Sequence, residues 1–109
     1  MLFAYFLVDW VLVSDVSECS GSEIDQGQLE NVIQCGERCR GVSTMFIFGT
    51  NDYGKTPCEN GKCRCWCETS ATTDGTCDIT TNNGFRLYAY VGDDFAKGMD
   101  FISTMSMKI

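Results

Sequence analysis

Eight cysteines in a chain of 109 residues constrain the fold of this protein more than any other feature. A domain of this length has a small core, and an even number of cysteines in such a chain usually forms a disulfide framework in an oxidising compartment. We therefore predict a secreted, extracellular protein in which all eight are disulfide-bonded: Cys19, Cys35, Cys39, Cys58, Cys63, Cys65, Cys67 and Cys77.

The stretch "CENGKCRCWCET" predicts a strand with cysteines on one face. In a strand, Cys63, Cys65 and Cys67 point the same way at intervals of about 6.6–7 Å, so they must bond to another element and not to one another. A predicted helix offers Cys35 and Cys39, which as an i,i+4 pair lie about 6 Å apart on one side. The matching pitch predicts two disulfides between helix and strand. Eight cysteines allow about 105 pairings, so the connectivity stays open.

Metal binding and redox catalysis are weaker interpretations of the same cysteines. Structural zinc sites favour paired Cys-x2-4-Cys knuckles, whereas the Cys-x3-Cys of Cys35 and Cys39 lies on the predicted helix. A catalytic dithiol usually has the form Cys-x-x-Cys, which the chain lacks. We therefore expect no metal and no other cofactor.

The residue types that are missing argue against other classes of function. The chain has no histidine, which excludes Ser-His and Cys-His catalytic pairs, and no spacing of Asp and Glu singles out an acid/base pair. Nucleotide-binding and EF-hand motifs are also absent from the sequence. The net charge of −7 disfavours nucleic acid as a partner. We expect a protein that is not an enzyme.

The apolar start "MLFAYFLVDWVLVS" predicts a secretory signal peptide over residues 1–17. It is too short for a stable membrane span, and Asp9 interrupts it. Leu12 and Ser14 suit the −3 and −1 positions of a cleavage site. Two alternatives remain open, namely a first β-strand of the folded domain and a fragment whose true start lies upstream.

The remaining pattern predicts a small disulfide-rich α+β domain over residues 18–92, in which one helix packs on an antiparallel sheet. The helix should start at Asp25, with Gln28 completing a capping-box-like pattern, and end at Gly41. Strands are expected at 45–48, 62–68 and 85–91. The tail, residues 93–109, is predicted either as a helix or as a frayed segment. The expected core residues are Leu29, Val32, Ile33, Ile47 and Leu87.

The order of these motifs resembles the PAN/apple family of extracellular modules over residues 19–91. The motifs are "QCGERCRG" on a helix, then "MFIFGT", "CRCWCE" and "FRLYAYV". The family commonly has a cysteine before its F-x-F/Y strand, where this chain has Val42, Ser43 and Thr44, so the family's connectivity is not carried over. The resemblance implies a non-catalytic module that binds extracellular proteins or carbohydrates.

Strand alternation places the candidate binding face. If the cysteines at 63, 65 and 67 face the helix, Arg64 and Trp66 face away, and Arg86, Tyr88 and Tyr90 face away from the core in the last strand. In neighbouring strands these five residues would form one ligand-binding patch for a protein or glycan, because Trp, Tyr and Arg dominate binding hot spots. The alternative to a binding patch is that Trp66 is an ordinary core residue. The alternative to a binding module is a stand-alone secreted venom or defence peptide.

Overall fold

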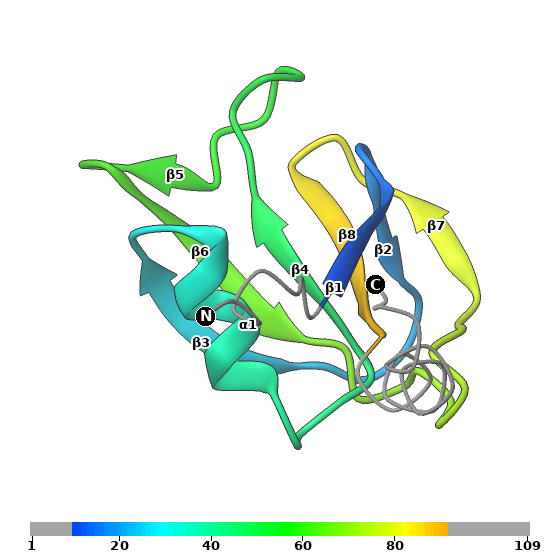
Figure 1. Cartoon of the computed structure of the whole chain (residues 1–109). Coiled ribbons are helices and arrows are strands. Elements are labelled where there is room, and N and C mark those ends of the chain that lie inside the picture. Colours follow the sequence, from blue (N-terminus) through cyan, green and yellow to red (C-terminus); the bar gives the residue numbers. More distant parts are fainter. Residues whose placement is uncertain (1–9, 92–109) are drawn as a thin grey trace, which may run out of the picture.

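The computed structural model describes residues 10–91, which form an antiparallel sheet with a helix on one face and a two-stranded ribbon on the other (Figure 1). The sheet follows the order β1 (Trp10–Ser14), β8 (Phe85–Tyr90), β4 (Met45–Gly49), β6 (Lys62–Cys67) and β3 (Ile24–Leu29), with β5 (Cys58–Glu59) also paired to β6. The ribbon is β2 (Ser17–Cys19) with β7 (Ile79–Thr81), and the helix is α1 (Val32–Cys39). The predicted α+β fold, one helix on an antiparallel sheet, is confirmed.

Strand β4 is the centre of the domain, as its apolar sequence predicts. All five of its residues are buried, and it pairs with β8 on one side and β6 on the other. Phe46 and Phe48 point to the helix face, while Met45 and Ile47 point to the ribbon face. Figure 1 shows α1 across the part of the sheet formed by β3, β6 and β4, with β2 beside β8.

Four disulfides connect these layers. Cys35–Cys65 and Cys39–Cys67 join α1 to β6, which confirms the predicted link between the helical pair and the alternating strand cysteines. Cys58–Cys63 closes the β5–β6 hairpin, and Cys19–Cys77 ties β2 to the segment before β7. All eight cysteines are thus in disulfides.

The predicted start of the helix is wrong. Asp25 lies in β3, where its side chain accepts a hydrogen bond of 2.7 Å from the amide of Gly27, and Gly27 has a φ of +81° that a helix does not allow. The cap is Asn31, whose Oδ1 accepts from the Gln34 amide at 2.9 Å while Gln34 Oε1 accepts from the Glu30 amide at 2.8 Å. The capping-box pattern therefore occurs six residues later than predicted. The predicted end is confirmed, because Gly41 follows the helix with a φ of +80°.

The predicted core is divided between the two faces of the sheet. Leu29 and Val32 pack with the helix-face cysteines, but Ile47 and Leu87 lie on the ribbon face. Ile33 is 61% exposed, because Cys35 and Cys39 fix which side of α1 meets the sheet.

An aromatic cluster fills the helix face beside the disulfides. Phe46 stacks on Tyr88 at 5.1 Å between ring centroids, and Trp10 meets Phe46 edge-on at 5.5 Å. The Tyr90 hydroxyl donates to the carbonyl oxygen of Gly36 in α1. Tyr88 and Tyr90 therefore do not face away from the core, and the prediction that they do is wrong.

Residues 10–14 form β1, in agreement with the alternative that the apolar start contributes a first strand. Trp10 pairs with Tyr90, and its ring packs on Gly36. Residues 1–9 and the tail predicted as helical or frayed lie outside the described residues, and cleavage of a signal peptide stays a prediction. Among residues 10–91 no helix has the length and apolarity needed to cross a bilayer.

Removal of one helix-to-strand disulfide should destabilise the domain more than removal of the hairpin disulfide. Loop-closure entropy gives about 2 kcal/mol for either bridge, because Cys39–Cys67 still closes most of the loop of Cys35–Cys65. Cys35 and Cys65 are fully buried whereas Cys58 and Cys63 are partly exposed, so only the helix-to-strand variant also buries two serine hydroxyl groups in an apolar core. Chemical denaturation of Cys35→Ser/Cys65→Ser against Cys58→Ser/Cys63→Ser measures the difference. Equal loss in the two double variants would show that the helix staple does not organise the fold.

Gly36→Ala should destabilise the folded domain although alanine favours helices. A Cβ at Gly36 would lie 2.5 to 2.8 Å from the Trp10 ring, and such overpacking costs about 1–3 kcal/mol. In a Trp10→Ala background the same change should be neutral or stabilise by up to about 1 kcal/mol. Thermal melts of the four proteins form the cycle. A gain in stability from Gly36→Ala in the unmodified chain would mean that β1 does not cover the helix, as would follow from removal of a leader that includes Trp10.

Candidate functional site

A groove of about 430 Å³ opens on the ribbon face of the sheet. Ile47, Trp66 and Phe85 supply its apolar surface from the three neighbouring strands β4, β6 and β8. Trp66 is half-buried and packs against the ribbon-face core, so its ring is held in place at the groove. The polar and remaining lining residues are Glu18, Glu23, Gln28, Thr56, Pro57, Glu59 and Arg64.

The groove is acidic. Three carboxylates line it, and Arg64 is its one basic residue. The Arg64 guanidinium is already held by Asp25, with Nη1 at 2.9 and 3.2 Å from the two carboxylate oxygens. The surface thus favours neutral or cationic ligands over anions.

Three glutamates meet at one end of this region, and we refer to Glu18, Glu23 and Glu68 as the glutamate cluster. Each offers a carboxylate oxygen, and these oxygens all lie within 4.8 Å of one another. The strand register explains the approach: Ile24 pairs with Cys67, so the preceding Glu23 and the following Glu68 come side by side, and β2 brings Glu18.

Glu68 is fully buried, although it is ionisable. Its Oε2 accepts a hydrogen bond of 2.9 Å from the Cys19 amide, whereas its Oε1 is buried with no hydrogen-bond partner. Burial raises the pKa of Glu68 to about 8, against the lowering effect of the Cys19 hydrogen bond and with a smaller raising effect from Glu23. Burial also raises the pKa of Glu23, against the lowering effect of a hydrogen bond with the Glu68 carboxyl group, and the negative charges of Glu18 and Asp25 add smaller raising effects.

The sulfur atoms of Cys35, Cys39 and Cys65 also lie close enough together to contact one metal ion. All three are in disulfides, and the ligand form of cysteine is the free thiolate. The carboxylates of the glutamate cluster are therefore the better-suited ligand set.

The five predicted ligand-binding residues do not form one patch. Arg64 and Trp66 lie in the groove, but Tyr88 and Tyr90 pack on the helix face. Two features separate them. Strand β4 lies between β6 and β8, and the predicted residue Trp66 of β6 faces the ribbon, whereas Tyr88 and Tyr90 of β8 face the helix.

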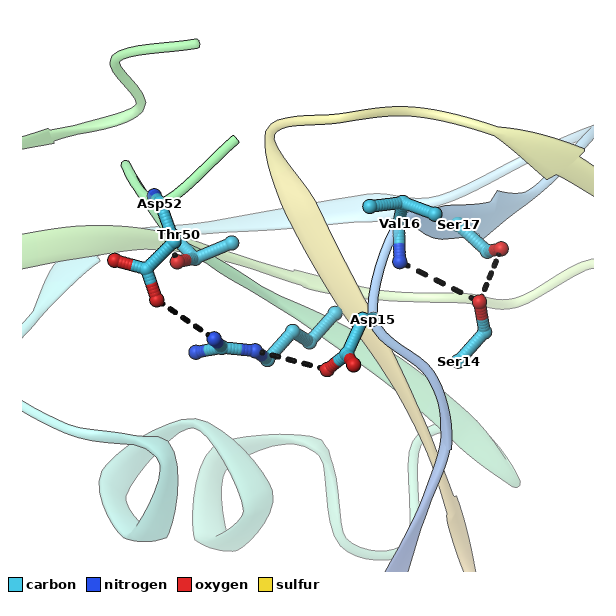
Figure 2. Close-up of polar contacts among 7 residues, drawn as sticks. Ser14, Asp15, Val16, Ser17, Thr50 and Asp52 are labelled. Carbon is cyan, nitrogen blue, oxygen red and sulfur yellow. Dashed lines mark hydrogen bonds and ion pairs between the residues drawn. The ribbon is translucent and has the colours of Figure 1, made fainter. Parts of the chain in front are cut away.

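Arg86 is engaged in ion pairs and is not a free binding residue. Its Nη2 lies 2.7 Å from Asp52 Oδ2 and its Nε lies 3.3 Å from Asp15 Oδ1. Figure 2 shows Asp15 and Asp52 on two sides of this contact. The adjoining turn is closed by Ser14 Oγ, which accepts from the Val16 amide and hydrogen-bonds to Ser17 Oγ at 2.6 Å (Figure 2). Arg86 thus joins the β1–β2 turn to the loop after β4.

The sequence pattern does not predict the glutamate cluster. Glu68 ends the predicted strand, but nothing in its neighbours signals burial. Glu23 precedes the residues that the pattern predicts as helix, so the pattern does not place it opposite Glu68. The residue that indicates the pairing is Gly27, because a glycine at this position disfavours a helix and favours a bulged strand.

Comparison with known proteins identifies no relative: no family model, no curated protein and no solved structure matches the chain. The resemblance to PAN/apple modules stays a prediction.

The stability of the domain should fall as pH rises from about 5 through about 8 in the presence of a chelator. The folded-state pKa of Glu68 lies above its ordinary value of 4.5, so folding favours the protonated form, and this contribution is lost as pH rises through the folded value. Glu68→Gln keeps an acceptor for the Cys19 amide and should flatten the dependence of the melting temperature on pH. Glu59→Gln, at an exposed groove residue, is the control and should keep it. An unchanged dependence in Glu68→Gln would contradict the assignment.

Proposed function

We propose that this chain is a secreted, non-catalytic binding module, and that it binds a neutral glycan in the acidic groove. The observation that carries the proposal is Trp66, held half-buried in a groove whose other walls present carboxylates and an amide. Binding sites are typically concave and apolar with a few convergent polar groups.

The groove has the two kinds of surface that sugar recognition requires. The ring faces of Trp66 and Phe85 suit the apolar face of a pyranose. The carboxylates of Glu18 and Glu59 accept hydrogen bonds from hydroxyl groups, and the Gln28 amide both donates and accepts.

Charge selects among possible ligands. The groove is lined by three glutamates, and the chain carries a net charge of −7, which disfavours sulfated or phosphorylated glycans. A basic peptide suits the same charge, but a peptide would make less use of the aromatic surface. The neutral glycan is therefore the occupant that we propose.

Secretion is supported by the four disulfides, which persist in oxidising compartments and stabilise domains of this size. The resemblance to PAN/apple modules implies the same class of function, namely extracellular recognition without catalysis.

A glycan array with the disulfide-bonded protein, followed by calorimetric titration of the best binder, tests the proposal. Trp66→Ala should weaken binding by about tenfold or more, as expected for a central aromatic anchor. Arg64→Ala removes a side chain that lines the groove, so glycan affinity should fall. It breaks only an exposed ion pair with Asp25, so the melting temperature should be nearly unchanged. Tyr53→Ala, at an exposed aromatic outside the groove, is the matched control.

Full affinity in Trp66→Ala and Arg64→Ala would refute the groove as the binding site. Capture of only sulfated glycans, or of only basic peptides, would refute the neutral glycan as the ligand.

A further inference from the structure

We propose that the glutamate cluster is a calcium site. Glu18, Glu23 and Glu68 come from three separate segments and place one carboxylate oxygen each within 4.8 Å of the others. Carboxylate oxygens are the ligands that calcium prefers. The cation site stands on this cluster alone and does not require the proposed glycan.

The spacing of the three oxygens allows one calcium ion to contact all of them. Calcium–oxygen distances of about 2.3–2.6 Å allow two ligands on opposite sides of the ion to lie about 4.6–5.2 Å apart. The separations within the glutamate cluster are all at most 4.8 Å and so lie within this range. Magnesium gives up its bound waters reluctantly and is seldom held by a set of ligands that all come from the protein, so calcium is the better-suited ion.

An unpartnered buried atom points to a ligand at this place. The Glu68 side chain is fully buried, and its Oε1 has no hydrogen-bond partner; Glu23 Oε1 is buried and unpartnered as well. A buried polar atom without a partner carries a desolvation penalty that native proteins usually avoid. The two carboxyl groups contact each other, so either a proton shared between them or a cation bound between them would satisfy both oxygens.

The surrounding hydrogen bonds orient the carboxylates as an outer shell does in metal sites. The Cys19 amide holds Glu68 Oε2 at 2.9 Å, and Asn82 Nδ2 donates to Glu18 Oε2 at 3.0 Å. Each contact uses one oxygen and leaves the other for a ligand, and such contacts fix ligand geometry.

No protein cation neutralises the cluster. Within residues 10–91, the ion pairs are made by arginines with other carboxylates, and none involves Glu18, Glu23 or Glu68. Like charges opposite each other in a sheet destabilise it. The glutamate cluster therefore requires either a shared proton or a bound cation, and an experiment at neutral pH separates the two.

Thermal melts of the disulfide-bonded protein in EDTA and in about 10 mM calcium test the site. With a Kd of roughly 10⁻⁴–10⁻³ M, as in extracellular calcium modules, calcium should raise the melting temperature by at least about 4 °C. Magnesium at the same concentration should raise it less. No shift with calcium would overturn the proposal and leave the shared proton as the explanation.

Two variants locate the effect. Glu68→Gln and Glu23→Gln each remove one ligand charge while keeping an amide oxygen, so both should fold and lose at least about tenfold in calcium affinity. Glu59→Gln removes one charge from the same groove outside the cluster and should keep the calcium shift. A full calcium shift in the Glu68 and Glu23 variants would place the ion elsewhere and overturn the proposal.

Terbium luminescence gives a readout that is independent of stability. Terbium(III) replaces calcium at oxygen sites and emits when a nearby tryptophan is excited, and Trp66 lines the same groove as Glu18 and Glu23. Emission should appear with the unmodified protein, fall on addition of excess calcium and be lost in Trp66→Phe. Trp10→Phe, on the opposite face, is the control and should keep the emission. Emission that persists in Glu68→Gln would contradict the site, whether or not a glycan binds.

Discussion

The two disulfides between α1 and β6 set the orientation of the other elements in the domain. Successive helix-facing cysteines of β6 and the i,i+4 cysteines of α1 have nearly the same spacing, so Cys35–Cys65 and Cys39–Cys67 form side by side without a change in either element. Once they form, the face of β6 that carries cysteines must meet the helix. Strand β6 pairs with β4, and β4 pairs with β8. The orientation of β6 therefore decides which side chains of these strands face the helix and which face the ribbon.

This constraint explains which parts of the fold can be predicted from the sequence. Cysteine alternation, the fully apolar β4 and the glycine after α1 are local patterns, and each one identified its element correctly. The prediction of where α1 starts is wrong because the sequence contains two competing capping patterns, Asp25 with Gln28 and Asn31 with Gln34. Two features favour the second pattern. Gly27 has a positive φ that a helix does not allow, and residues 24–29 pair with β6 as the strand β3.

The candidate site was harder to predict, because it depends on neighbours that no local pattern specifies. Alternation within a strand correctly put Trp66 on the side away from the cysteines, but it does not say that β4 lies between β6 and β8. The glutamate cluster depends on the pairing of β3 with β6 and on the Cys19–Cys77 disulfide, which attaches β2 beside them. Glu68 shows the result: the Cys19 amide holds one of its carboxylate oxygens, and the other is left buried without a partner.

The pairing of β1 with β8 has a consequence for the order in which the chain folds. Trp10 pairs with Tyr90, so the edge of the sheet joins the two ends of the described chain. During synthesis, residues 10–14 leave the ribosome long before their partner strand exists, and they cannot pair until residue 90 has emerged. The hairpin closed by Cys58–Cys63 needs only local contacts and can form early, whereas closure of the sheet at β1 requires a long-range contact and must come late. Until then Trp10 lacks its contact with Tyr90, whereas Val11, Leu12 and Val13 stay exposed even in the folded domain. Completion of the last strand therefore covers one large aromatic side chain of β1 and leaves its aliphatic residues in solvent.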